Sequence, residues 1–361
     1  GSATLHFHFH GKGDLVLDFA GDGFNGRCIV NGKRVAAKWI REHILIPNRH
    51  LKQGANELSL SFVSADAALN RHDDYLYTLF VPARARTAFP CFDQPNLKAR
   101  FLLDLQLPEG WKQINSADSH PIPTYLFSFT AGKFQESIAQ RDGRTLRALF
   151  RETNARKTGQ LNKVCDEVAL SLRWLEAYTG ISYPFDTYGF VILPGYQFGG
   201  MEHPGAIQFT DREIFLGDNP TPDEELRRLQ LIAHETAHMW FGDLVTMHWF
   251  SDVWTKEVFA NFFAAKISRE QFPEINHDLN FLKAYQVRAL STNRTDGTHP
   301  IQQSLANLKD AGLLYGNIIY QKAPVMMRKL EEQIGETHLR NGIRKYLRYF
   351  AYGNASWNQL I

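Results

Sequence analysis

The sequence predicts a multidomain protein, with an N-terminal all-β domain of the saddle or sandwich type in residues 1–151 and a mixed α/β, mostly helical domain in residues 152–361. Two observations support this division. Short segments of the first part alternate apolar and polar residues, the period of a half-buried strand, and the second part has apolar residues at helical spacing. The length of 361 residues is sufficient for two or three domains, each with its own core.

Six segments of the first part have the alternation that favours a strand, with turn signals such as Asn31-Gly32 between them. They are residues 5–10, 15–19, 57–62, 101–107, 125–129 and 146–150. In the second part, residues 157–178 have a helical period and residues 188–193 predict a short strand. Helices are expected to dominate from Thr221 onward.

Composition argues against several classes of protein. The net charge of +2 is too small to favour a nucleic acid or an anionic membrane as a partner. No apolar run approaches the roughly 18 residues of a membrane span, so we expect a soluble protein, either cytoplasmic or periplasmic/secreted. Three cysteines are too few for a disulfide framework. The oligomeric state stays open at this point.

A helix is predicted from Thr221 to about Trp240. Thr221 can act as the N-cap, proline follows it in the first turn, and Glu224 completes a capping box. Gly242 is the expected stop signal.

This helix contains the sequence His234-Glu235-Thr236-Ala237-His238, an H-E-x-x-H motif. The spacing of four residues places both imidazoles on one face, one turn apart, so that they can bind one metal ion. Two solvent-facing histidines without a metal are the alternative interpretation.

A zinc site needs a third protein ligand and one open position for water. Glu257 lies on a second predicted helix, residues 252–266, and eighteen residues separate it from His238, enough for a turn and an antiparallel return. The same helix face holds Ala260, Asn261 and Ala264, which are small enough for close helix packing. A buried glutamate there is costly unless a cation meets it. The sequence therefore predicts one Zn²⁺ per chain, bound by His234, His238 and Glu257.

The two neutral imidazoles and one carboxylate leave the site with a net charge of +1, which favours deprotonation of a zinc-bound water near neutral pH. Glu235 points to the same side and is not needed as a ligand. It is the expected general base, taking a proton from that water and passing it to the leaving amine. The predicted reaction is metal-assisted hydrolysis of an amide.

Three segments resemble the aminopeptidase N family of zinc metallopeptidases. Residues 234–246 resemble the metal helix of this family, residues 253–260 its third-ligand helix, and residues 89–95 a segment of its N-terminal β-domain. The resemblance implies a thermolysin-like catalytic domain in residues 152–361, which would continue beyond Ile361. It also implies a zinc-dependent aminopeptidase that hydrolyses the N-terminal peptide bond of peptides with a free N-terminus.

The resemblance also implies roles for further residues. A stretch that stands at the family's exopeptidase motif would bind the substrate, and Glu202 within it would bind the α-ammonium group. Tyr320 matches the family tyrosine that donates to the oxyanion of the scissile carbonyl, and Tyr315 is a weaker candidate for lining the cleft. Without the resemblance, Glu202 is an ordinary loop carboxylate and Tyr320 one aromatic residue among many. The substrate-binding stretch consists of Gly199, Gly200, Met201 and Glu202.

The chain departs from the family pattern at several positions. Val81 stands where the family has a second amine-binding glutamate, and Leu79 replaces a neighbouring glutamine. His203 replaces the asparagine of the exopeptidase motif, and Ala323 and Pro324 replace a glycine and an alanine after Tyr320. These changes affect the expected substrate preference and leave the zinc ligands intact.

Three other functions are compatible with these motifs. A thermolysin-like endopeptidase would share the zinc site without needing Glu202. An epoxide-hydrolysing relative would share the zinc motifs and the tyrosine, and a non-catalytic relative would only bind peptides. Cleavage of N-blocked peptides, a lipid-epoxide assay and a test for turnover distinguish these functions.

Overall fold

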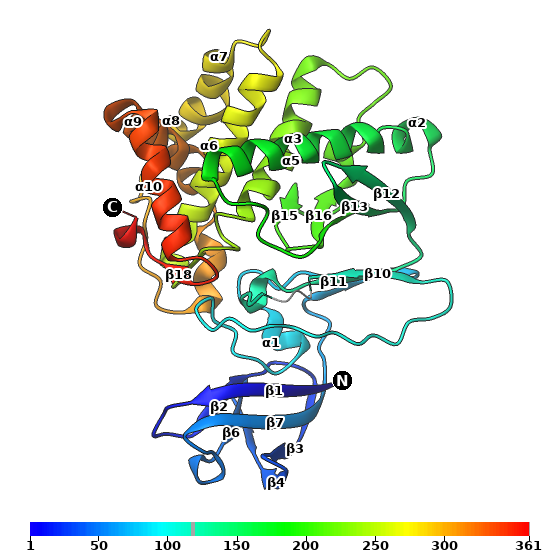
Figure 1. The fold of residues 1–361 in the computed structure, drawn as a ribbon. Helices are drawn as coiled ribbons and strands as arrows, with labels where there is room; N and C mark the ends of the chain where they lie inside the picture. Colours follow the sequence, from blue (N-terminus) through cyan, green and yellow to red (C-terminus); the bar gives the residue numbers. More distant parts are fainter. Residues whose placement is uncertain (117–119, 361) are drawn as a thin grey trace.

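The computed structural model describes residues 1–116 and 120–360, and its N-terminal part is a sandwich of two antiparallel sheets (Figure 1, blue). The first sheet has the strand order β1-β7-β3-β4 and the second the order β2-β6-β5. The strands of the first sheet are β1 (Ser2–Phe9), β3 (Gly23–Val30), β4 (Lys33–Ala36) and β7 (Gly54–Val63). Those of the second are β2 (Leu15–Asp18), β5 (Lys38–Ile40) and β6 (His43–Ile46).

The sandwich encloses a hydrophobic core of its own. Leu17 of β2, Ile44 of β6 and Leu58 of β7 are fully buried in it, whereas Val16 between the inward residues of β2 is exposed. This alternation is the pattern that predicted the strands at residues 5–10, 15–19 and 57–62, and those three predictions are confirmed.

A third antiparallel sheet lies between this sandwich and the helical part of the molecule (Figure 1, cyan). Its strand order is β10-β11-β9-β8, and the short helix α1 (Ala85–Ala88) lies beside it. The strands are β8 (Leu69–Arg71), β9 (Tyr75–Thr78), β10 (Lys112–Asn115) and β11 (Phe129–Gly132).

Two strand predictions in this region are wrong. Residues 101–107 alternate between half-buried and exposed side chains as expected, but within the described residues they pair with no neighbouring strand. Residues 125–129 were expected to form a strand and instead begin in the 3₁₀ turn Thr124–Leu126, because Pro123 starts that turn and lacks an N–H for a sheet ladder.

The central sheet of the second half has the order β12-β13-β14-β16-β15 and mixes parallel and antiparallel pairs. Strands β13, β14 and β16 are parallel, and β14 is buried along its whole length, as expected for a strand covered on both faces. β12 and β13 precede residue 152 and belong to this sheet; the division into domains after residue 151 stays a prediction. The strands are β12 (Gln135–Arg141), β13 (Arg144–Phe150), β14 (Tyr188–Leu193), β15 (Gly200–Met201) and β16 (Ile207–Thr210).

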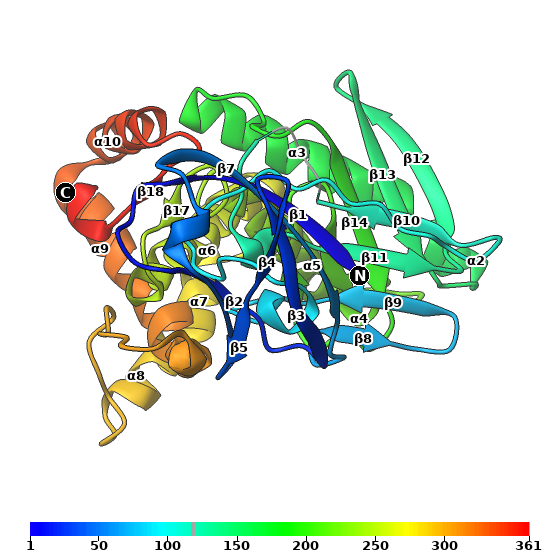
Figure 2. The same ribbon diagram turned by 90° about the horizontal axis from the view of Figure 1, so that it is seen from below.

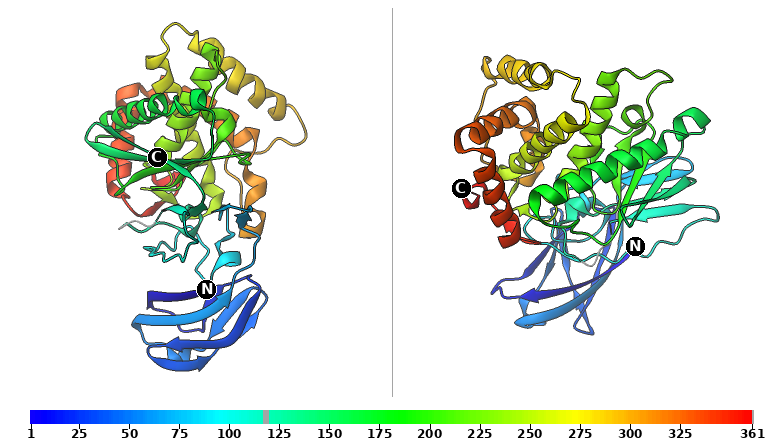
Figure 3. Two further views of the ribbon diagram at one scale, coloured as in Figure 1. Left: turned by 90° about the vertical axis from the view of Figure 1, so that its right-hand side faces the viewer. Right: turned by 45° about the horizontal axis from the view of Figure 1, so that its top comes forward.

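Helices make up most of the remaining chain and cover this sheet (Figure 3). The expected helix of residues 157–178 is interrupted at Gly159–Gln160, so that α2 and α3 are separate. Among the described residues, no helix is both long enough and apolar enough to cross a lipid bilayer. The helices are α2 (Ala155–Thr158), α3 (Leu161–Thr179), α4 (Asp211–Ile214), α5 (Pro222–His238), α6 (Val253–Gln271), α7 (His277–Phe281), α8 (Val287–Asn293), α9 (Ala323–Ile334) and α10 (Glu336–Tyr349).

Helices α5 and α6 pack against each other and position the candidate site. The expected capping box of α5 is present: the Thr221 hydroxyl accepts from the Glu224 N–H, and the Glu224 carboxylate accepts from the Thr221 N–H. α5 ends at His238, two residues before the expected end, and Gly242 in the following turn has a φ of +133°. α6 extends five residues beyond its expected end at residue 266.

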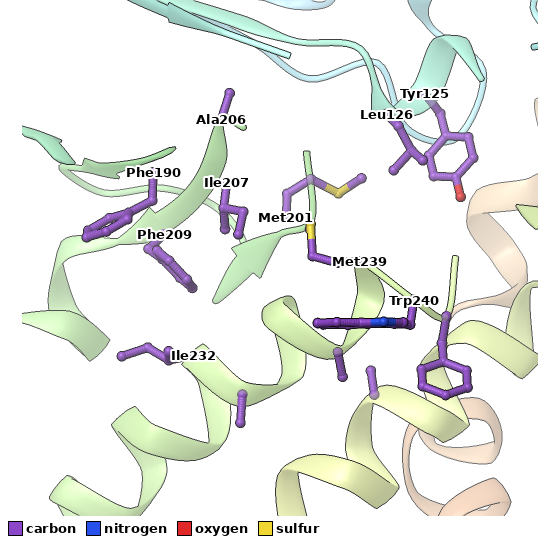
Figure 4. Packing of buried hydrophobic residues seen from close by; sticks show 14 of the residues in the cluster. Tyr125, Leu126, Phe190, Met201, Ala206, Ile207, Phe209, Ile232, Met239 and Trp240 are labelled. Atoms are coloured by element: carbon purple, nitrogen blue, oxygen red, sulfur yellow. The ribbon is translucent and has the colours of Figure 1, made fainter. Parts of the chain in front are cut away.

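The sheet packs on α5 through large apolar side chains. Figure 4 shows Phe190 and Phe209 of the sheet on the side of Ile232 of α5, with Met201 near Met239, directly after the end of the helix. α5 is also bound to α3 by a buried ion pair, in which two nitrogens of Arg228 donate to Glu167 at 2.9 and 2.8 Å. The helix that contains the H-E-x-x-H motif is therefore held on two sides.

The turn after α5 is tied to distant parts of the chain. The two-residue strands β17 (Thr246–Met247) and β18 (Asn354–Ala355) pair in parallel. Half-buried Lys98 donates to the carbonyl oxygen of Gly353 at 2.9 Å and faces that of Asp243 at 3.4 Å. Seen from below, the N-terminal sandwich lies in front of this region (Figure 2).

Candidate metal centre

His234, His238 and Glu257 converge at the contact between α5 and α6. The Nε2 atoms of the two histidines are 3.1 Å apart, and Oε2 of Glu257 lies 3.4 Å from Nε2 of His234 and 3.6 Å from that of His238. His238 and Glu257 are buried, and the His234 side chain is 15% exposed. The site therefore opens toward solvent on the His234 side.

These distances fit a single zinc ion. Ligand atoms at 2.0–2.1 Å from a tetrahedral metal are about 3.4 Å from one another, and the three observed separations of 3.1, 3.4 and 3.6 Å lie around this value. Two nitrogens and one carboxylate oxygen form a donor set that zinc accepts. Three acceptor atoms that face one another at these distances repel one another electrostatically unless a cation lies between them.

The second nitrogen of each histidine has a partner of its own. His238 Nδ1 lies 3.0 Å from the carbonyl oxygen of Phe241, and His234 Nδ1 lies 3.1 Å from Oδ1 of Asn261. Both partners are acceptors, so each histidine has its proton on Nδ1 and presents the lone pair of Nε2 to the centre. This is the tautomer that a metal ligand needs.

Glu235 is buried beside the three candidate metal ligands and is 4% exposed. Burial raises the pKa of its carboxyl to about 8, the imidazole of His234 opposes this increase, and the charges of Glu202 and Glu257 add to it. A Cβ atom at Gly200 would clash with the Glu235 carboxylate, so the glycine permits close approach of β15 to the helix. A carboxylate in this place can exchange protons with a ligand held at the centre.

Glu202 lies directly beside the ligands and has a partner that the sequence did not indicate. The ammonium of Lys256 is 2.6 Å from Oε1 of Glu202 and 2.6 Å from Oε1 of Glu257, and all three side chains are buried. Burial opposes ionisation of these carboxyls, but Lys256 lowers the pKa of Glu202 to about 2 and that of Glu257 well below its usual value. The two carboxylates in turn raise the pKa of Lys256 well above its usual value, against the effect of burial.

Lys256 was missed because a lysine beside a predicted ligand is most often exposed. The position of Lys256 in the helix is the signal that could have indicated its burial. It directly precedes Glu257 on α6, whose residues 256–260 are all buried. A lysine inside such a run needs a buried carboxylate as a partner.

The remaining residues of the exopeptidase stretch form the edge of the central sheet. Gly200 and Met201 make up β15, which pairs with β16 and leaves its other edge free of strands among the described residues. The carbonyl oxygen of Gly199 accepts from the N–H of Thr210 at 2.9 Å. An edge of this kind can pair with an extended peptide.

Tyr320 lies on a π-helical turn, Ile318–Lys322, directly before α9. Burial raises the pKa of its phenol well above the usual value, and the charge of Glu257 adds to the increase. The ring of Tyr315 stacks at 6.2 Å from that of Tyr320, and burial raises the pKa of Tyr315 as well. Both phenols are therefore neutral donors over the physiological pH range.

The positions that depart from the family pattern lie in two environments. Leu79 is 1% exposed in the core, whereas Val81 is half-buried. His203 is fully buried, its Nδ1 lies 2.9 Å from the carbonyl oxygen of Leu126, and burial lowers its pKa to about 4. Nε2 of His203 has no hydrogen-bond partner among the described residues.

Comparison with known proteins places these features in one family. Residues 164–361 match the Peptidase family M1 domain, and residues 65–126 match the Peptidase M1 N-terminal domain. A leucyl aminopeptidase of Saccharolobus solfataricus is 30% identical over 305 residues, which cover 78% of this chain and 38% of that protein. The aminopeptidase N of Streptomyces lividans is 26% identical, with 88% of this chain and 39% of that protein covered.

A further relative is the puromycin-sensitive aminopeptidase of Caenorhabditis elegans, which is 28% identical, with 77% of this chain and 31% of that protein covered. The chain thus spans less than two fifths of the length of these relatives. The family match covers more than half of the chain, and the resemblance expected from residues 89–95, 234–246 and 253–260 is confirmed. The chain belongs to peptidase family M1.

Proposed function

We propose that this chain contains the active site of a zinc-dependent aminopeptidase that removes single residues from peptides with a free N-terminus. The main support is the convergence of His234, His238 and Glu257 with ligand atoms 3.1–3.6 Å apart. The three relatives described above are each named as an aminopeptidase, which agrees with this activity.

The three ligands would hold one zinc ion per chain, which supplies Lewis-acid polarisation of the scissile carbonyl and lowers the pKa of a coordinated water. Glu235 accepts a proton from the attacking water and passes it to the leaving amine. Its burial beside His234 keeps its pKa near the neutral range in which a general base is most efficient.

Two further residues act on the substrate. Tyr320 donates its phenolic O–H to the oxygen of the scissile carbonyl as negative charge develops there. Glu202 accepts hydrogen bonds from the substrate α-ammonium, while Gly199, Gly200 and Met201 pair with the peptide backbone along the free edge of β15. The position of the amine relative to the metal then selects the first peptide bond.

The test is a panel of aminoacyl-anilides measured with the 361-residue chain, with zinc and with a chelator. We expect hydrolysis that the chelator abolishes and zinc restores. The Glu235→Gln variant should bind zinc normally and lose at least about a hundredfold in kcat, the size of a lost general base.

Two other outcomes would contradict the proposal. Cleavage of N-acetylated peptides at the same rate as free ones would indicate an endopeptidase instead. Zinc binding without turnover of any anilide or peptide would favour a lipid-epoxide substrate or a peptide-binding role, which an epoxide-hydrolysis assay separates.

A further inference from the structure

We propose that Asn261 is a positioning residue that links the metal ligand His234 to the segment containing Tyr320, and that it does so because Pro324 leaves the Tyr320 carbonyl without its helical partner. The inference about catalysis rests on the function proposed above. The inference about metal binding and local structure does not.

Asn261 has contacts on both sides of the site. It lies on α6 four residues after Glu257, and therefore on the same helix face as this ligand. Its Oδ1 is 3.1 Å from Nδ1 of His234, and its Nδ2 donates to the carbonyl oxygen of Tyr320 at 3.2 Å. One amide group thus bridges α5 and the turn before α9.

Only one orientation of this amide satisfies both neighbours. The Tyr320 carbonyl can only accept, so it must face the NH₂ group of Asn261. The oxygen of Asn261 then faces His234 Nδ1, which must be the protonated nitrogen and leaves Nε2 free for the metal. Asn261 therefore fixes the tautomer of one ligand and the position of one backbone carbonyl together.

The need for an outside donor comes from Pro324. In an uninterrupted α-helix the carbonyl of Tyr320 accepts from the N–H of residue 324, and proline has none. The ring of a proline also crowds the carbonyl four residues before it, and the chain here widens into the π-helical turn Ile318–Lys322 before α9 begins. The Nδ2 donor of Asn261 replaces the missing N–H.

Two substitutions separate the two contacts. Asn261→Asp keeps an acceptor for His234 but removes the donor to Tyr320, whereas Asn261→Ala removes both. Asn162→Ala is the matched control, because Asn162 is an exposed residue on α3 whose side chain makes no hydrogen bond to the site among the described residues. Pro324→Ala supplies a backbone N–H at the position where the wild-type chain lacks one.

Metal affinity is measured by competition with a chromophoric zinc chelator. We expect Asn261→Ala to lose about 10–100-fold in zinc affinity, the usual effect of removing the partner of a metal-bound histidine. Asn261→Asp should stay within about threefold of wild type, since its carboxylate still accepts from His234. Wild-type affinity in Asn261→Ala, or an equal loss in both variants, would overturn the link to His234.

The link to Tyr320 is measured by amide hydrogen exchange over residues 315–323. Both Asn261 variants should exchange faster there than wild type and Asn162→Ala. Adding Pro324→Ala to Asn261→Asp should restore most of the protection, because the new N–H can bond the Tyr320 carbonyl. Unchanged exchange in Asn261→Asp, or no recovery in the double variant, would refute this part.

Catalysis gives an additional measurement if the wild-type chain is an aminopeptidase. Asn261→Asp should then lower kcat on aminoacyl-anilides about tenfold with little change in KM, and Pro324→Ala should recover part of it. If the wild-type chain has no such activity, the proposed function fails, while zinc affinity and hydrogen exchange still decide the role of Asn261.

Discussion

The metal side and the amine side of the candidate site are built in opposite ways. On the metal side, three acceptor atoms face one point and each histidine is oriented by a neutral acceptor behind it. On the amine side, the carboxylate of Glu202 already has a cation, the ammonium of Lys256 at 2.6 Å. The half-buried Val81 stands where the family resemblance implies a second carboxylate.

This difference indicates where the chain is free to vary. A metal with three protein ligands tolerates little change in ligand type or distance. Recognition of an ammonium group can be divided among different carboxylates, and a built-in lysine reduces the net negative charge that a substrate meets. We therefore expect metal binding to follow the family and substrate preference to depart from it.

The largest expected effect is on stability and concerns Lys256. Lys256→Met leaves two buried carboxylates without their cation, which should lower the free energy of unfolding of the metal-free protein by about 3–5 kcal/mol. The measurement is urea unfolding in the presence of a chelator. Lys266→Met is the matched control, since this lysine of α6 also contacts two glutamates but is partly exposed, and it should cost no more than about 1 kcal/mol. Equal losses of unfolding free energy in both variants would show that the buried pairing of Lys256 contributes no more to stability than the partly exposed pairing of Lys266.

The next effect concerns recognition of the substrate amine. Glu202→Ala removes a charge-assisted hydrogen bond of about 1.5–3 kcal/mol, so kcat/KM for aminoacyl-anilides should fall about 10–100-fold. Zinc affinity should change far less, because Glu202 is not one of the three ligands. Unaltered kinetics on free-amine substrates would remove Glu202 from the amine site.

A smaller effect is expected on the pH dependence of stability through His203. Burial lowers the pKa of His203 to about 4, below its ordinary value near 6.5, so the unfolded chain binds more protons between these values. The neutral imidazole therefore contributes stability that is complete above pH 6.5 and is lost as pH falls toward 4. His203→Asn, which does not titrate, should reduce the loss between pH 6.5 and 4.5 by roughly 2 kcal/mol.

Unfolding of both metal-free proteins by urea at the two pH values checks this prediction. The comparison between variants removes the contribution of the other titrating groups. Identical pH dependence for His203→Asn and wild type would mean that the imidazole is accessible to protons in the folded state.

The smallest effect is expected from a substitution that restores the family pattern on the amine side. Val81→Glu adds a second carboxylate for the substrate ammonium and should lower KM for aminoacyl-anilides about tenfold, equivalent to roughly 1.4 kcal/mol. Val81→Gln has nearly the same shape without the charge and should leave KM close to that of wild type. A similar gain in both variants would indicate that shape and not charge limits binding.

Sequence patterns predicted the fold best where local and tertiary requirements agree. The capping box at Thr221 and the buried strand Tyr188–Leu193 follow directly from their residues. Residues 101–107 show the opposite case, because alternation specifies an extended chain and does not supply a neighbouring strand. Whether a strand finds a partner depends on distant parts of the chain.

The candidate site shows the same limit. The spacing of His234, His238 and Glu257 along two helices was sufficient to expect their convergence, since helix geometry fixes which side chains share a face. The long-range contacts of the residues around these three side chains were not foreseen. Lys256 bonds Glu202, fifty-four positions away, and Asn261 bonds the Tyr320 carbonyl, fifty-nine positions away. Contacts over such distances depend on packing, which no local pattern encodes.

The tie between Lys98, the turn after α5 and Gly353 has a consequence for biosynthesis. During translation the helix with both histidines is complete more than a hundred residues before Gly353 and β18 emerge from the ribosome. Until then the ammonium of Lys98 lacks the carbonyl of Gly353, and the edge of β17 lacks β18. A nascent chain can therefore form the H-E-x-x-H helix early, but the turn that supports it acquires its final shape only after Gly353 and β18 have been synthesised.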